Sequence, residues 1–109
     1  MMAAAGPAIL DGEQLRQRTM GNEAMRVEIL SLFVTEAERL LRQVGQAHDP
    51  QTRSDRLKAM RALARNVGAL RLDEAARLAD LDADLPDPGL EPLSRAVAEV
   101  VAVIRAGGP

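Results

Sequence analysis

The stretch "LKAMRALARNVGALRL", from Leu57 to Leu72, decides how this chain folds. Its first half places apolar residues at spacings of three and four, so that they share one face of a helix: Leu57, Met60, Ala64 and Val67. Gly68 follows this stripe directly, and glycine is the residue at which helices most often end. The pattern predicts a helix over 50–67, a stop at Gly68, and a further helix over 72–85.

The rest of the chain predicts helices as well. Alanine, leucine, arginine and glutamate dominate, and these residues favour helices, whereas strand patterns are nearly absent. We predict five helices, over 11–19, 22–47, 50–67, 72–85 and 91–105. Four amphipathic helices joined by short loops predict an all-α, antiparallel up-down four-helix bundle, with the short first helix capping one end. The bundle should span residues 9–105, between flexible tails at 1–8 and 106–109.

Each long helix has an apolar set that we expect to face the core. In the second helix the set is Met25, Ile29, Leu32, Phe33, Leu40 and Val44. In the fourth it is Leu72, Ala75, Ala76, Leu78, Ala79, Leu81 and Leu85. In the fifth it is Leu93, Val97, Val100, Val101 and Ile104.

Composition excludes several kinds of site. The chain has 109 residues, no cysteine and one histidine, so it offers neither a disulfide nor an obvious metal site. Its formal net charge is −2 and its aromatic content is 1%, which disfavours nucleic acid because the overall charge is negative and stacking rings are lacking. No apolar run approaches the roughly 20 residues of a membrane span. We expect a cytoplasmic protein without a metal or cofactor.

Charge is unevenly distributed along the chain. Residues 53–65 contain five basic residues and one acid, a balance of +4, whereas residues 71–87 contain two basic residues and six acids, a balance of −4. On the predicted third helix, four residues share one face opposite the apolar stripe: Lys58, Arg61, Ala62 and Arg65. The simplest interpretation of this face is an ordinary solvated surface.

The order of helices resembles that of the histidine-phosphotransfer (HPt) domain, a four-helix module that carries phosphate between receiver domains. The likeness covers about residues 9–105. "LDGEQLRQRTMGNEAMRVEILSLFVTEAERLLRQV" resembles the family's opening helices, with Phe33 at the usual aromatic position. "ARNVGALRL", residues 64–72, resembles the segment that follows the family's His-x-Leu-Lys-Gly motif. Aligned back from Gly68, that motif falls on four residues: Lys58 for histidine, Met60 for leucine, Arg61 for lysine and Ala62 for glycine.

The resemblance fails at the phospho-accepting position. HPt chemistry needs a neutral imidazole, whose lone pair attacks an aspartyl phosphate. Lys58 carries an ammonium group with a reference pKa of about 10.4 and no lone pair. The lone histidine, His48, follows the second helix beside Asp49, where the helix dipole and the carboxylate both favour the less nucleophilic imidazolium. The resemblance therefore implies a non-enzymatic member with no catalytic residue.

Three functions follow from these observations. The leading hypothesis is a catalytically silent HPt-like module in phosphorelay signalling. It would dock the acidic pocket of a receiver domain, from a response regulator or a hybrid histidine kinase, through Lys58, Arg61, Ala62 and Arg65. The alternative is a helical scaffold or dimerisation module without a receiver partner, using any exposed residues among Leu40, Leu41 and the valines of the fifth helix. A third is an active phosphotransfer protein, if the alignment is shifted or Lys58 replaces a native histidine.

Overall fold

The computed structural model describes residues 7–86 and 88–108, and within them it contains five helices and no strand. The helices are α1 Gly12–Arg18, α2 Glu23–Gln46, α3 Pro50–Val67, α4 Leu70–Leu81 and α5 Glu91–Arg105. The predicted all-α class is confirmed. Four of the five predicted ranges agree to within one residue at each end, and the fourth does not.

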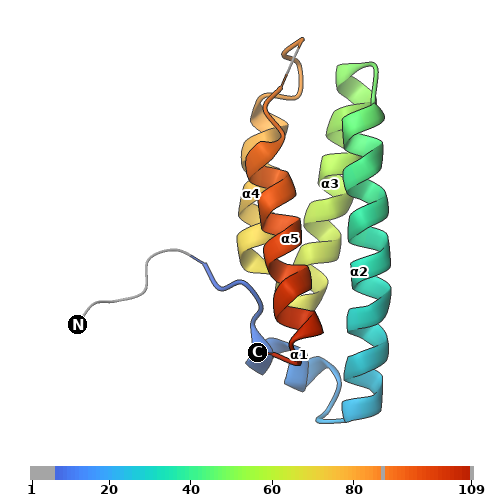
Figure 1. The fold of residues 1–109 in the computed structure, drawn as a ribbon, viewed down its shortest axis with the longest axis vertical. Coiled ribbons are helices and arrows are strands. Elements are labelled where there is room, and N and C mark those ends of the chain that lie inside the picture. The colour runs from blue at the N-terminus through green and yellow to red at the C-terminus, as the bar shows by residue number, and fades with distance from the viewer. Residues whose placement is uncertain (1–6, 87, 109) are drawn as a thin grey trace, which may run out of the picture.

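The four long helices close a ring. α2 contacts α3, α3 contacts α4, α4 contacts α5, and α5 contacts α2 (Figure 1). α1 lies at the end of this ring where α2 begins (Figure 1). The pairs α2–α3 and α4–α5 are therefore opposite sides of the ring, and each pair presents its own outer surface.

The predicted fourth helix is wrong at both ends. α4 begins at Leu70, because the turn at Gly68 needs only two residues before the next helix starts. It ends at Leu81, where the backbone N–H groups of Asp82 and Ala83 donate to carbonyls three residues back. The carbonyls of Ala83 and Leu85 then accept hydrogen bonds from the side chain of Arg53, so they are satisfied outside a helix.

The starts of the three N-terminal helices are fixed by side-chain caps. The carboxylate of Asp11 accepts from the N–H of Gln14 at 3.2 Å, and Asn22 caps α2 in the same way. Asp49 accepts from the N–H of Thr52 at 2.8 Å, and its pKa lies below its ordinary value of 3.8 mainly because of that bond. Side-chain oxygens at this position satisfy N–H groups that lack a partner within the helix. The sequence has an aspartate or asparagine directly before each of these three helices.

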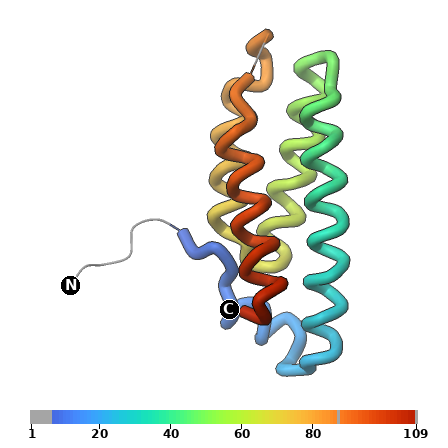
Figure 2. Tube along the Cα trace, in the orientation of Figure 1, coloured from blue at the N-terminus to red at the C-terminus, as the bar shows by residue number. Residues whose placement is uncertain are grey.

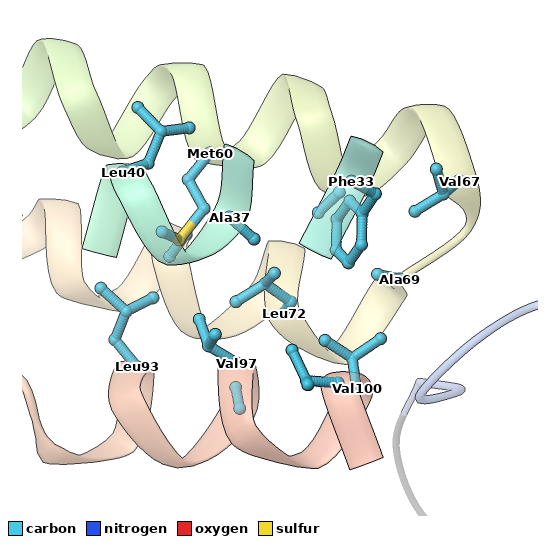
Figure 3. Packing of buried hydrophobic residues seen from close by; sticks show 14 of the residues in the cluster. Phe33, Ala37, Leu40, Met60, Val67, Ala69, Leu72, Leu93, Val97 and Val100 are labelled. Carbon is cyan, nitrogen blue, oxygen red and sulfur yellow. The ribbon is translucent and has the colours of Figure 1, made fainter. Parts of the chain in front are cut away.

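The core is built from aliphatic residues around a single aromatic ring. Figure 3 shows side chains from all four long helices pointing into one interior, among them Phe33, Met60, Leu72 and Val97. The predicted buried stripe of α3 is confirmed in full: Leu57, Met60, Ala64 and Val67 are buried. A close-packed interior of this kind is the main source of stability in a small domain.

Some residues expected in the core are exposed. Leu32 is 65% exposed, because the buried residues of α2 follow a stripe from which it is offset: Leu30, Phe33, Ala37, Leu40 and Val44. Each residue turns a helix by about 100°, so a position next to Phe33 already leaves the buried face. Met25, Leu78, Leu81 and Leu85 are also exposed, and the last two lie at or beyond the end of α4.

The segment that precedes α1 forms backbone hydrogen bonds with the turn between α3 and α4. Gly68 adopts a left-handed conformation with φ +80°, and Ala69 N–H donates to the carbonyl of Ala64 at 2.8 Å. Asp11 N–H donates to the carbonyl of Gly68 at 2.8 Å, and Arg71 N–H donates to that of Ala8 at 2.9 Å. Figure 2 traces this path of the chain past the turn. A single backbone conformation at Gly68 therefore holds three segments together.

Residues on both sides of the expected range 9–105 form hydrogen bonds with the helices. The carbonyl of Ala8 accepts a hydrogen bond from the Arg71 N–H of α4, while residues 1–6 lie outside the described part of the chain. After α5, the carbonyl of Gly108 accepts a hydrogen bond from the Arg26 side chain at 2.9 Å, and Pro109 lies outside the description.

We predict that Gly68→Ala destabilises the protein by about 2 kcal/mol. The left-handed conformation costs an alanine roughly 1–2 kcal/mol. The added Cβ would also lie 2.9 Å from Asp11 Cβ and close to that residue's backbone. Urea denaturation monitored by circular dichroism measures the change.

Gly45→Ala is the matched control, because Gly45 lies in α2 and a Cβ there meets nothing within 4 Å. Alanine favours a helix interior over glycine by about 0.5–1 kcal/mol, so this variant should be more stable than the wild type. Equal effects of the two substitutions would contradict the role assigned to Gly68.

Candidate functional site

The outward face of α3 carries the residues that the sequence singled out, but in two different settings. Lys58 and Ala62 are exposed, one helical turn apart, and Ala59 beside them is exposed as well. Within the described residues, no carboxylate lies within 4.0 Å of the Lys58 ammonium group. Two alanines and one unpaired lysine thus form a low surface with a single projecting charge.

Arg61 and Arg65 do not form the free cationic ridge that the sequence predicted, since both bind one carboxylate of α4. Arg61 Nε donates to Asp73 Oδ1 at 2.8 Å, and Arg65 Nε lies 3.3 Å from Asp73 Oδ2. The side chains of Arg61 and Asp73 are only 26% and 19% exposed, so this pair belongs to the α3–α4 joint. The one carboxylate of Asp73 therefore offsets one of the two positive charges expected beside Lys58.

Arg53, the first basic residue of the segment 53–65, does not face solvent. It is 8% exposed, and its guanidinium donates to the carbonyls of Ala83, Leu85 and Ala47. This side chain ties the start of α3 to the turn after α4 and to the end of α2. Its position was readable in the sequence, because 53 lies four residues before Leu57 and so continues the buried stripe.

An apolar strip that was not expected from the sequence lies beside the outward face of α3, where α2 and α3 meet. Gln43 of α2 lines a shallow depression together with Thr52 and Arg56 of α3, so these edges of the two helices meet. Leu32 precedes Gln43 by eleven residues, about three turns, and so lies on the same edge of α2.

The matching edge of α3 continues from Thr52 and Arg56 to Ala59 and Leu63, seven residues or two turns further on. Ala59 is exposed and Leu63 is half-buried. We call Leu32, Lys58, Ala59, Ala62 and Leu63 the docking face.

Other candidate chemistry is not assembled in the structure. His48 is exposed in the short connection between α2 and α3, before α3 begins and away from Lys58 in its middle. Among the described residues, no three side chains of histidine, cysteine, aspartate or glutamate are grouped to hold a metal ion. No described helix combines the length and apolar character that crossing a membrane requires.

The surface suggested for a scaffold or dimer is also corrected. Leu40, Val97, Val100 and Val101 are buried in the core, and Leu41 is half-buried. They follow the inward stripes of α2 and α5, so they are not available to a partner. The large apolar residues that are exposed lie elsewhere: Met20, Met25, Val27, Leu32, Leu78, Leu81 and Leu85.

Comparison with known proteins adds no family to this picture. No family model matches the chain, and no match was found among curated proteins or among solved structures. The likeness to HPt domains remains a prediction based on the residues described above.

We predict that Arg53→Met lowers the free energy of unfolding by about 2–3 kcal/mol. Methionine keeps the apolar stem but leaves buried carbonyls without their charged donor, a loss of that size. Arg56→Met is the control, because Arg56 is exposed and should change stability by less than about 0.5 kcal/mol. Chemical denaturation of both variants measures the difference in the free energy of unfolding. A similar small effect in each would contradict the stabilising role assigned to the Arg53 hydrogen bonds.

Proposed function

We propose that this chain is a phosphorelay signalling module of the HPt type that docks a receiver domain without accepting its phosphate. The observation that carries the proposal is the exposed, unpaired Lys58 in the middle of α3, set among Ala59 and Ala62 beside Leu32. Position 58 is where the sequence resemblance places the family's histidine. The partner would be a response regulator or the receiver domain of a hybrid histidine kinase.

The proposal includes the antiparallel up-down four-helix bundle. Three residues connect α2 to α3 and two connect α3 to α4, and such short connections favour antiparallel neighbours. Nine residues join α4 to α5. The closed ring of contacts between the four long helices supports the same arrangement.

The charge of Lys58 determines which kind of surface the docking face attracts. In the HPt resemblance, the receiver's phosphorylation pocket is acidic, and Lys58 offers it an ammonium group that no described carboxylate neutralises. Arg65, with a half-exposed side chain, supplies a weaker positive field because it shares Asp73. Charge complementarity of this kind contributes more to association rate and specificity than to affinity.

Affinity would come from the apolar part of the face. Leu32 is the large exposed side chain there, and the small Ala59 and Ala62 allow a partner's backbone to approach α3 closely. Binding energy in such interfaces is concentrated in a few apolar or aromatic contacts at the centre. Lys58 would then provide orientation at the edge of that contact.

The module would not act as an enzyme. An exposed lysine stays protonated near neutral pH and has no electron pair with which to attack an aspartyl phosphate. A chain with this face would instead occupy a receiver, compete with a true phosphotransfer domain, or hold a receiver near another protein.

Titration against receiver domains from the same source organism tests the proposal. We expect micromolar binding, and a loss of at least about tenfold in Lys58→Glu and in Ala62→Glu, which place a charge of the wrong sign on the docking face. Arg61 is left unchanged because reversing it would disrupt the α3–α4 joint. Calorimetry measures the affinities, and circular dichroism verifies that each variant is folded.

Arg42→Glu is the matched control for Lys58→Glu, since it changes the net charge by the same amount at an exposed position of α2. Binding that all three variants share with the wild type would contradict the docking face. Failure of every receiver to bind would favour the scaffold alternative.

A further inference from the structure

An apolar groove runs along the side of the ring opposite the docking face, between α4 and α5. It has a volume of about 290 Å³, and its apolar walls are formed by Ala75, Leu78, Ala79, Pro92 and Leu93. Leu78 is 48% exposed at its edge. A large exposed apolar side chain beside an apolar groove is typical of contact surfaces.

The charges around this groove are not balanced. Arg71 at its rim is paired with Glu99 at 2.7 Å, and Glu74 is paired with Arg77 at 2.7 Å. Asp82, also at the rim, has no salt-bridge partner within 4.0 Å among the described residues.

Asp80 and Asp84 border a different depression, between the start of α3 and the end of α4, and do not line the α4–α5 groove. The charged residues of the groove itself are Arg71, Glu74 and Asp82. Because Arg71 and Glu74 are each paired, Asp82 leaves the groove with a negative charge that is uncompensated within the described part of the chain.

The groove between α2 and α5 provides a useful comparison. It is larger, at about 480 Å³, and also has apolar walls, including Val27, Val34 and Ile104. Its charges, however, pair with one another: Arg105 lies 4.0 Å from Glu38, and Arg26 lies 3.5 Å from Glu23. Nothing there selects the charge of an occupant, whereas the α4–α5 groove has a surplus of one sign.

We propose that the α4–α5 groove binds an amphipathic helix of a partner protein that is basic on its polar side. Its apolar side chains would enter between Ala75 and Leu93 and cover Leu78. Its lysines or arginines would lie against Asp82 at the rim. Helices that dock in grooves use apolar residues at spacings of three and four as anchors, and charges at the rim select the partner.

This second surface goes beyond the docking of a receiver and does not depend on it. The α2–α3 and α4–α5 pairs are opposite sides of the ring, so a partner on one does not cover the other. A chain with both surfaces can hold a receiver domain and a basic helix at once. A protein that does not accept phosphate could then act as an adaptor between these two partners.

Two synthetic peptides test the proposal with the full chain. One is a helical peptide with leucine at every third or fourth position and lysine on its other side, and the other has glutamate in place of each lysine. The chain is labelled with ¹⁵N and titrated with each peptide. We expect the lysine peptide to bind at least about tenfold more tightly and to shift the amide signals of Ala75, Ala79 and Leu93.

Variants separate this groove from other apolar surfaces. Leu78→Asp should weaken binding of the lysine peptide at least about tenfold, whereas Leu32→Asp on the docking face should leave it unchanged. Asp82→Lys should reverse the preference between the two peptides, whereas Asp84→Lys, outside the groove, should leave it unchanged. Both leucines are exposed, so the variants should fold.

Equal affinity for the two peptides, or absence of binding, would overturn the proposal. Signals that shift around Leu32 and Leu63 instead would overturn it as well. Because no receiver domain takes part, failure here leaves the proposed function of the docking face untouched.

Discussion

The buried edge of α3 is the constraint on which the rest of the structure depends. This helix contacts both α2 and α4, and Leu57, Met60 and Ala64 on it are inaccessible to solvent. Arg53 continues the same edge and hydrogen-bonds to the connections at one end of the ring. Gly68 closes the other end and binds the chain before α1. Since the inward edge is fixed at both ends, the outward residues of α3 are fixed too.

The buried edge of α3 follows a local repeat, and such local repeats are what the sequence could predict. Helices and their buried stripes repeat a local pattern of three and four residues, so α3 and α5 were predicted almost to the residue. The end of α4 depended on Arg53, which lies in another helix and takes the carbonyls of Ala83 and Leu85. A contact between residues 30 positions apart leaves no periodic trace in the sequence.

The candidate site was predicted in the same uneven way. The positions of Lys58 and Ala62 on the outward face followed from helical spacing alone. The compensation of Arg61 and Arg65 by Asp73 did not, because it depends on how α4 is rotated against α3. Leu32 was assigned to the core because its stripe was drawn too wide. A face expected to be a cationic ridge is instead one free lysine beside small and apolar side chains.

The proposed function requires that position 58 occupies the place of a phospho-accepting histidine on an otherwise intact docking face. Lys58→His tests this requirement directly, with acid-labile phosphate measured after mixing with a phosphorylated receiver domain. Ala62→His, one turn away, is the control. We expect that Lys58→His takes up phosphate and that the wild type and Ala62→His do not. Phosphate on the wild type, or none on a Lys58→His variant that still binds the receiver, would contradict the proposed function.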